Sequence, residues 1–236
     1  MSHDFFRFKQ FCIHHDRCAM KVGTDGVLLG AWGCVQGKRI LDIGTGTGLI
    51  ALMAAQRNPD AEVLGIDIDE AAVLQAKENV QRSMFKGRCS ILKQDVLTFE
   101  AETPFDAILC NPPFFTEDTL PDNKGRALAR NNKSLPFGQL IPKVSSLLAE
   151  GGKFSLIIPS WLTTEVISLC LESGLYLERR CQVRTTTKKP PRRTLLMFSF
   201  DNSQQTTDDR QQELILMAED GSRSQQYQDL TKDFYL

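Results

Sequence analysis

A glycine-rich turn that follows a short apolar run constrains this chain more than any other feature. Residues 39–43 are mostly apolar, Asp42 is the acid within them, and glycines stand at positions 44, 46 and 48. A strand that enters such a loop and continues as a helix lets backbone N–H groups approach a cofactor closely. The stretch therefore predicts an α/β fold with a cofactor site at the end of this strand.

The spacing of these glycines decides between several kinds of cofactor loop. A dinucleotide-binding loop would need a glycine at position 49, which is Leu49, so NAD is disfavoured. A P-loop would close with Gly-Lys-Ser/Thr, which does not follow, and ATP bound in that way is excluded. A tight strand-to-helix turn without a ligand remains the simplest alternative.

The pattern Asp-x-Gly-x-Gly-x-Gly over residues 42–48 resembles motif I of the class I S-adenosylmethionine (SAM) methyltransferases. In that family the acidic residue and the loop hold the charged methionine end of the cofactor. The resemblance implies that SAM is the cofactor and that it contacts Asp42, Gly44, Thr45 and Gly46.

Two acidic residues close the next two predicted strands. Asp67 emerges beside the glycine loop, where its carboxylate can accept both ribose hydroxyls, and Ile68 after it is expected in the same site. Asp95 can accept from the adenine amine while Val96 lies against the ring. A helix cap is the alternative role for Asp95, and it is the role expected of Asp69.

A fourth predicted strand, 105–110, runs into Asn111-Pro112-Pro113-Phe114. The prolines fix the backbone and remove N–H donors, so the Pro112 carbonyl and the Asn111 amide oxygen can face outward as acceptors. An amide or exocyclic NH₂ is a poor nucleophile because its lone pair is delocalised, and two acceptors that grip its hydrogens can aim that lone pair. Phe114 would stack on the target. We assign these four residues to catalysis, with Asn111 also bordering the cofactor, although Asn-Pro-Pro alone is an ordinary turn.

The order of these motifs resembles that of the N-P-P-[FY] amino-methyltransferases, which act on adenine N6, guanine N2 or a protein glutamine amide. Within that group, residues 20–32 and 230–236 look like those of the bacterial tRNA1(Val) (adenine(37)-N6)-methyltransferases. The resemblance covers nearly the whole chain. It implies the class I SAM-methyltransferase (Rossmann-like) fold, a three-layer α/β sandwich around a seven-stranded, mostly parallel sheet with a C-terminal antiparallel hairpin. It also implies a monomeric enzyme whose substrate is an adenine in the anticodon stem-loop of tRNA.

The N-terminal segment resembles motif X of the same enzymes, which covers the methionine end of SAM. Lys21 and Thr24 are its candidate site residues, followed by a predicted helix at 26–32. A packed N-terminal extension is the alternative. Spaced aromatic residues at Phe6, Phe8 and Phe11 predict a short strand or hairpin before it.

Basic residues gather in two places. The polar loop 116–134 is too long for an ordinary connection and contains Arg126 and Arg130, so we expect it to contact the substrate, although a solvated loop is the alternative. Seven cations and no acid lie between positions 179 and 193, where a hairpin is predicted. We expect phosphate contacts there, although a solvated hairpin tip is the alternative. The RNA-binding candidates of the hairpin are Arg184, Lys188, Lys189, Arg192 and Arg193.

Composition agrees with one cytoplasmic domain. The 236 residues, with a net charge of −1, suit a single domain over 1–236, in which any affinity for nucleic acid comes from local patches. We divide it into an extension (1–38), a core sheet (39–200) and a tail (201–236). Seven cysteines without C-x-x-C indicate reduced thiols, and no signal or membrane segment is evident. The segment 12–18 gathers Cys and His, but its spacing matches no usual zinc site, so no metal is expected.

The remaining pattern completes the expected fold. Strands are predicted at 39–42, 61–67, 89–93, 105–110, 153–158, 176–185 and 194–200, with a possible edge strand at 213–218. Helices are predicted at 49–56, 70–81, 137–149 and 161–172, and the apolar tail 225–236 should dock on the body. Two alternative functions stay open: the same chemistry on guanine N2 or a protein glutamine, and a non-catalytic RNA-binding module.

Overall fold

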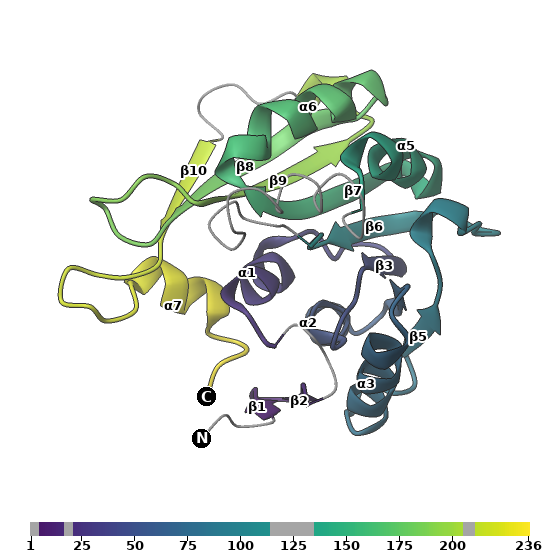
Figure 1. The fold of residues 1–236 in the computed structure, drawn as a ribbon, viewed down its shortest axis with the longest axis horizontal. Coiled ribbons are helices and arrows are strands. Elements are labelled where there is room, and N and C mark those ends of the chain that lie inside the picture. The colour runs from purple at the N-terminus through teal and green to yellow at the C-terminus, as the bar shows by residue number, and fades with distance from the viewer. Residues whose placement is uncertain (1–4, 17–20, 114–134, 205–210) are drawn as a thin grey trace, which may run out of the picture.

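The computed structural model describes residues 5–16, 21–113, 135–204 and 211–236. Within these ranges an eight-stranded sheet forms the centre of the protein, in the order β10-β8-β9-β7-β6-β3-β4-β5 (Figure 1). Neighbouring strands are parallel except that β9 runs antiparallel to β7 and β8. This confirms the mostly parallel sheet with an antiparallel hairpin. It has eight strands instead of seven because the possible edge strand forms, as β10.

The strands begin and end close to the predicted positions. They are β3 Arg39–Ile43, β4 Glu62–Asp67, β5 Cys89–Lys93, β6 Phe105–Cys110, β7 Leu148–Pro159, β8 Tyr176–Arg184, β9 Arg193–Ser199 and β10 Gln211–Ile215. The start of β7 differs most from the prediction, because Leu148 pairs with Phe105 of β6. The preceding helix therefore ends at Leu147, before the two glycines that were expected to close it.

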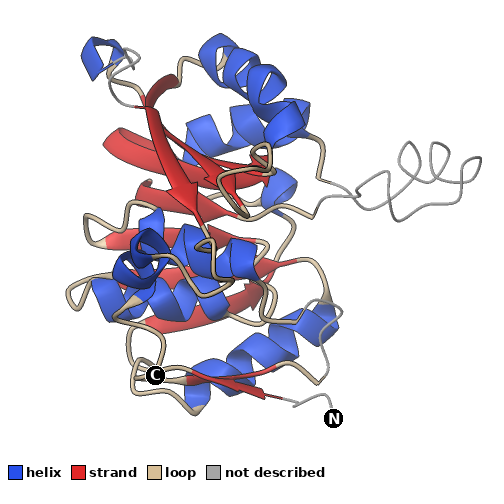
Figure 2. Ribbon diagram, turned by 90° about the vertical axis from the view of Figure 1, so that its left-hand side faces the viewer, coloured by secondary structure: helices blue, strands red, loops and turns tan. Residues whose placement is uncertain are grey.

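Helices cover both faces of the sheet, which gives the expected three layers (Figure 2). One face carries α1 Thr24–Trp32, α2 Leu49–Arg57 and α3 Glu70–Gln81, and the other carries α5 Phe137–Leu147 and α6 Thr163–Glu172. Short 3-10 turns are η1 Val96–Thr98, η3 Ser160–Leu162 and η4 Asn202–Gln204. The predicted helix 161–172 is thus split, with its first residues in η3.

Successive strand residues face the two helical layers in turn, because side chains alternate along a strand. In β6, Ala107 and Leu109 join the core under α1–α3, while Ile108 and Cys110 join the core under α5 and α6. The helix α3 forms as predicted: the Asp69 side chain accepts from the backbone N–H of Ala71 at its start. Its apolar stripe is buried in the first of these cores.

The two ends of the described chain pack on each other (Figure 1). The N-terminal segment forms the predicted hairpin, β1 Phe5–Arg7 and β2 Cys12–His14. The Lys9 backbone N–H donates to the Phe234 carbonyl at 2.8 Å, and the Phe8 ring stacks on that of Tyr235. With the helix α7 Gln225–Thr231 packed against α1 and β10, the predicted docking of the tail is confirmed.

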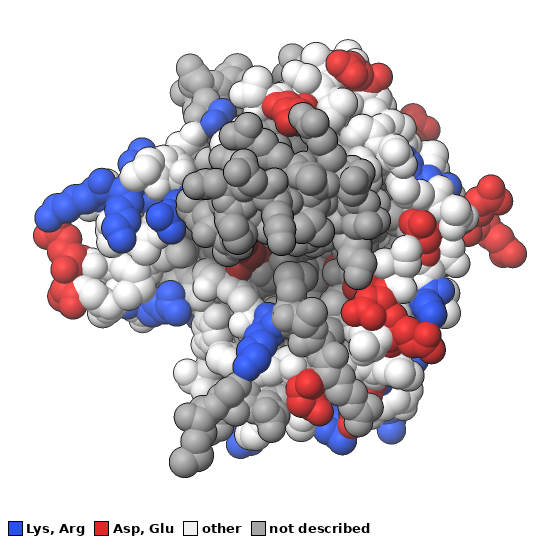
Figure 3. Space-filling model, in the orientation of Figure 1, with Lys and Arg blue, Asp and Glu red and all other residues white. Residues whose placement is uncertain are grey.

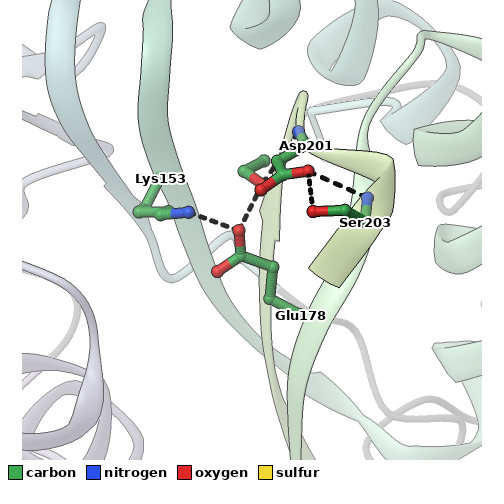
Figure 4. A network of polar contacts seen from close by, with 5 residues as sticks. Lys153, Glu178, Asp201 and Ser203 are labelled. Carbon is green, nitrogen blue, oxygen red and sulfur yellow. Dashed lines mark hydrogen bonds and ion pairs between the residues drawn. The ribbon is translucent and has the colours of Figure 1, made fainter. Parts of the chain in front are cut away.

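A buried ionic cluster joins β7, β8 and β9. It lies at the edge of the sheet opposite the glycine loop. Glu178 of β8 is 6% exposed and accepts from the Lys153 ammonium and the Ser199 hydroxyl (Figure 4). The Ser199 oxygen in turn accepts from the backbone N–H of Asp201 at 3.2 Å, and Asp201 accepts from Ser203. The network therefore ties β7, β8 and β9 together.

Removal of the central carboxylate should destabilise the fold without affecting the site. Glu178→Ala should lower the free energy of unfolding by roughly 3 kcal/mol, because it leaves the partly buried Lys153 ammonium without its partner. Urea titration would measure the change. Glu150→Ala, at an exposed position of the same strand β7, is the control and should change stability by less than ~0.5 kcal/mol. Equal effects of the two variants would contradict the role given to Glu178.

Candidate active site

The ends of three neighbouring strands bring the predicted site residues together. Ile43 of β3 pairs with Ile66 of β4 and with Cys110 of β6. The next residues, Gly44, Asp67 and Asn111, therefore lie side by side at the carboxyl edge of the sheet. The next described helices after the neighbouring strands β3 and β6 are α2 and α5, which lie on opposite faces of the sheet, and such a switch point is where α/β sheets bind ligands.

The glycine loop is open toward this edge. Gly44 and Gly46 have φ angles of 68° and 57°, in the left-handed region that favours glycine. A Cβ atom added at Gly44 would meet no heavy atom within 4 Å outside its chain neighbours, and one added at Gly46 would meet only the Gly44 carbonyl oxygen, at 4.0 Å. The backbone at both positions is therefore accessible to a ligand, as the sequence pattern predicts.

Asp42 lies beneath the loop with its side chain fully buried. Its Oδ2 accepts from the Thr45 hydroxyl at 2.6 Å and from the Ala51 backbone N–H at 3.1 Å, so it joins the loop to α2. Its Oδ1 has no hydrogen-bond partner among the described residues. Burial raises the pKa of Asp42 to about 7, although these hydrogen bonds favour the charged form. An uncompensated acceptor beneath an open loop fits a ligand with a positive charge, such as the methionine end of SAM.

The raised pKa makes stability depend on pH. Because an unfolded Asp titrates near ~3.9, the folded state binds more protons between about pH 4 and about pH 7, and stability falls as pH rises through this range. Between about pH 5 and about pH 8 the ligand-free protein should lose roughly 2–3 kcal/mol more unfolding free energy than Asp42→Asn. Urea titrations at both pH values would measure this, with Asp69→Asn as control. Parallel profiles of wild type and Asp42→Asn would contradict the assignment.

Asp67 holds the loop and the following turn. Its Oδ2 accepts from the Gly46 backbone N–H at 2.9 Å and its Oδ1 from the Asp69 backbone N–H at 2.9 Å. Ile68 beside it is 66% exposed, which is unusual for an apolar side chain at a strand end and suits a ligand that covers it. Asp67 and Ile68 therefore border the glycine loop, and their contacts with the cofactor stay predictions.

The structure places Asp95 and Val96 in local roles. The Asp95 Oδ1 accepts from the Leu97 backbone N–H at 2.9 Å and so caps η1, which was the alternative interpretation. Val96 is 5% exposed and packs in the core under α5 and α6. The cap uses one oxygen of Asp95, and the contacts of both residues with adenine stay predictions.

The N-terminal segment reaches the Asn-Pro-Pro turn. A Cβ atom added at Gly26 of α1 would lie 3.1 Å from Leu49 Cδ2 and 4.0 Å from Asn111 Nδ2. Thus α1, the start of α2 and Asn111 converge. Gly26 and Leu49 were not predicted to lie at the site. Pro112 is buried and Pro113 is exposed, whereas Phe114 lies outside the described residues. Lys21 is exposed before α1, and Thr24 begins that helix.

Two arginines of the basic hairpin form ion pairs with acidic residues of other elements. Arg184 forms an ion pair with Glu213 of β10, and Arg193 donates to the Asp25 carboxylate of α1 at 2.8 Å. Lys188, Lys189 and Arg192 are exposed, and none of them belongs to an ion pair within the described ranges. Figure 3 shows Lys and Arg side chains gathered at the left of the view, where Figure 1 places the β8–β9 turn. Arg126 and Arg130 lie outside the described residues.

Among the described residues, no group of three or more His, Cys, Asp or Glu side chains could hold a metal ion, and Cys18 lies outside them. In the same part of the chain, no helix has the length and apolar character needed to cross a bilayer.

Comparison with known proteins shows the family of this chain. The model of the family described as "Methyltransferase small domain" matches residues 25–173. A tRNA1(Val) (adenine(37)-N6)-methyltransferase of Bacteroides thetaiotaomicron is 50% identical over 187 residues, which are 78% of this chain and 79% of that protein. Its counterpart in Aeromonas hydrophila is 39% identical over 233 residues, 98% of this chain and 97% of that protein.

Solved structures agree on the fold. A predicted O-methyltransferase of Agrobacterium tumefaciens has a TM-score of 0.64 at 20% identity, with 89% of this chain and 96% of that chain covered. From the family match and the relatives together, this chain belongs to the methyltransferase small domain family, in the group of the tRNA1(Val) (adenine(37)-N6)-methyltransferases.

Proposed function

We propose that the protein transfers a methyl group from SAM to the exocyclic N6 amine of an adenine in tRNA, at position 37 of tRNA1(Val). The observation that carries this proposal is the adjacency of Asn111 to the open glycine loop at one sheet edge. The names of the relatives support the choice of tRNA and of adenine. We further propose that it acts in the cytoplasm as a monomer on the anticodon stem-loop, with no metal.

The residues present fit SAM at the edge of β3 and β4. Gly44, Thr45 and Gly46 would hold its methionine end above the buried Asp42, and Asp67 would accept from the ribose hydroxyls. Lys21 and Thr24 of the N-terminal segment would close the site over the methionine end. When bound, SAM would supply a methyl group on positively charged sulfur and leave as a neutral thioether. The amine gives up one proton to solvent only after it is methylated, so no general base is required before transfer.

Asn111 and Pro112 prepare the target amine. The amine donates its hydrogens to the Asn111 amide oxygen and the Pro112 carbonyl, and its lone pair is thereby aimed at the methyl group. Such fixed acceptors need no reorganisation during the reaction, which is a main source of enzymatic rate enhancement. Phe114 stacks on the adenine in this proposal. The adenine must be unstacked to reach the acceptors, as is usual for RNA bases in loops.

Incubation with labelled SAM and bulk tRNA that lacks the modification tests the function. We expect N6-methyladenosine after nucleoside analysis. If the product is N2-methylguanosine, or if a protein is labelled, the substrate is another amine, and Asn111 would orient that amine in the same way. If no RNA or protein acquires label while RNA still binds, the chain is a non-catalytic RNA-binding module.

The exposed cations of the hairpin serve as phosphate contacts in this proposal. Arg192→Glu should raise the KM for tRNA by about tenfold and weaken its dependence on salt, because one phosphate contact becomes repulsive. Steady-state kinetics at two salt concentrations would measure both. Lys77→Glu makes the same charge change on the exposed side of α3 and should leave the KM unchanged. Arg193 is a poor choice because reversal of its charge would also break the ion pair with Asp25.

A further inference from the structure

A cleft lies next to the first turn of α1. Its volume is ≈ 840 Å³, and it is enclosed by the start of α1, the end of β7 and the start of β9. The walls include Thr24, Asp25, Ser160, Trp161, Arg192 and Arg193. Thr24 belongs to the segment proposed to cover SAM, and Arg192 and Arg193 belong to the basic hairpin. Ser160 and Trp161 have no part in the proposed reaction and call for a separate role.

Trp161 is the most unusual of these residues. Its side chain is 68% exposed, whereas Trp32, the other tryptophan of the chain, is 7% exposed and covered by the Arg179 guanidinium at 4.6 Å. A large aromatic ring is normally highly buried, so an indole left in water at the wall of a cleft points to a partner.

The backbone that carries Trp161 is held in place. The Ser160 backbone N–H donates to the Arg192 carbonyl at 3.2 Å, and the Ser160 hydroxyl accepts from Thr194 at 3.2 Å. These bonds fasten η3 to β9. The indole is therefore presented from a turn that is fixed to the sheet, and Arg192 lies directly before β9, the strand to which this turn is bound.

The charges of the cleft favour an anionic group on the same side. Arg193 is neutralised by Asp25 at 2.8 Å, but Arg192 has no ion-pair partner within the described parts of the chain. Lys188 and Lys189 extend this positive charge along the hairpin. A flat ring that stacks on the indole, joined to a phosphate near Arg192, describes a nucleotide of single-stranded RNA.

The cleft adjoins the acceptors for the target amine. The first turn of α1 borders both places, since Thr24 and Asp25 line the cleft and Gly26 faces Asn111. Asn111 directly follows β6 and Ser160 directly follows β7, and these two strands are neighbours in the sheet. A strand of RNA whose base enters at Asn111 can thus place an adjoining nucleotide in the cleft.

We propose that the Trp161 cleft binds a nucleotide next to the target adenine, with its base stacked on the indole and its phosphate at Arg192. This inference rests on the proposed tRNA substrate and deepens it. The contact would hold the loop of the RNA open and set its register, so that one base reaches Asn111.

Tryptophan fluorescence tests the stacking directly, because Trp32 is buried and Trp161 is exposed. Addition of anticodon stem-loop RNA should quench the emission of the wild type and leave that of Trp161→Phe unchanged. Trp161→Ala should raise the KM for tRNA by about tenfold or more, as expected when base stacking is lost. The KM of Trp161→Phe for tRNA should lie between those of the wild type and Trp161→Ala. The affinity for SAM should not change in either variant. Leu171→Ala, at another exposed apolar residue, is the control and should behave as the wild type.

The outcomes separate this inference from the proposed function. If tRNA is methylated but the emission is not quenched, or the quenching persists in Trp161→Phe, the cleft does not bind a base and the inference is overturned. An unchanged KM of Trp161→Ala would overturn it as well. If RNA quenches Trp161 but no tRNA is methylated, the nucleotide site stands and the proposed reaction fails. Quenching by unrelated peptides and not by RNA would assign the cleft to a protein partner and overturn the inference.

Discussion

Replacement of Asn111 by Ala should lower the turnover number by at least ~10²-fold, the usual effect of removing one preorganised hydrogen-bond partner in a transition state. The amide oxygen lies at the end of β6, next to the glycine loop, and its removal leaves the Pro112 carbonyl as the only proposed acceptor for the amine. Single-turnover kinetics with saturating tRNA would measure the effect. The dissociation constant of SAM should change far less, since the loop of β3 is untouched.

Asn111→Asp is the matched variant for this experiment. It keeps the shape and an acceptor oxygen at the same position, so its turnover should fall between those of the wild type and Asn111→Ala. A structural turn residue would behave differently. If SAM binding and turnover fall equally in Asn111→Ala, Asn111 supports the turn and does not orient the amine.

Asp67→Ala should weaken SAM binding by roughly 10²-fold, because hydrogen bonds to a charged acceptor contribute ~1.5–3 kcal/mol each. The change would also free the Gly46 N–H, which now donates to Asp67 at 2.9 Å and holds the loop. Isothermal titration calorimetry would give the dissociation constant. The KM for tRNA, measured at saturating SAM, should stay near that of the wild type.

Asp69→Ala supplies the control for Asp67, two residues away on the same turn. Asp69 caps α3 by accepting from Ala71 at 3.1 Å, so its loss should cost ~1 kcal/mol of stability and leave SAM affinity unchanged. If both variants weaken SAM to the same degree, the effect comes from a loosened turn and the ribose contact of Asp67 is wrong.

Local pattern was sufficient for much of the fold. The apolar stripe and cap of α3 predicted Glu70–Gln81, and the apolar runs of β5 and β6 predicted both strands with their bounds. Such signals depend on neighbours in sequence, and the tertiary structure did not override them. The end of α5 was missed because Leu148 joins a strand through its pairing with Phe105, which no local pattern encodes.

For the site, the sequence determined which chemical groups are present: the glycine loop, the acids after the strands, the Asn-Pro-Pro turn and the surplus of cations before Arg193. Only the tertiary structure decided which of them meet. Strand pairing set Gly44 beside Asn111, Glu213 and Asp25 neutralised two of the expected RNA-binding arginines, and Trp161 was left exposed beside Arg192. The physical reason is that composition and periodicity report burial and local backbone preference, whereas contacts between distant segments depend on register, which is settled only when the whole sheet forms.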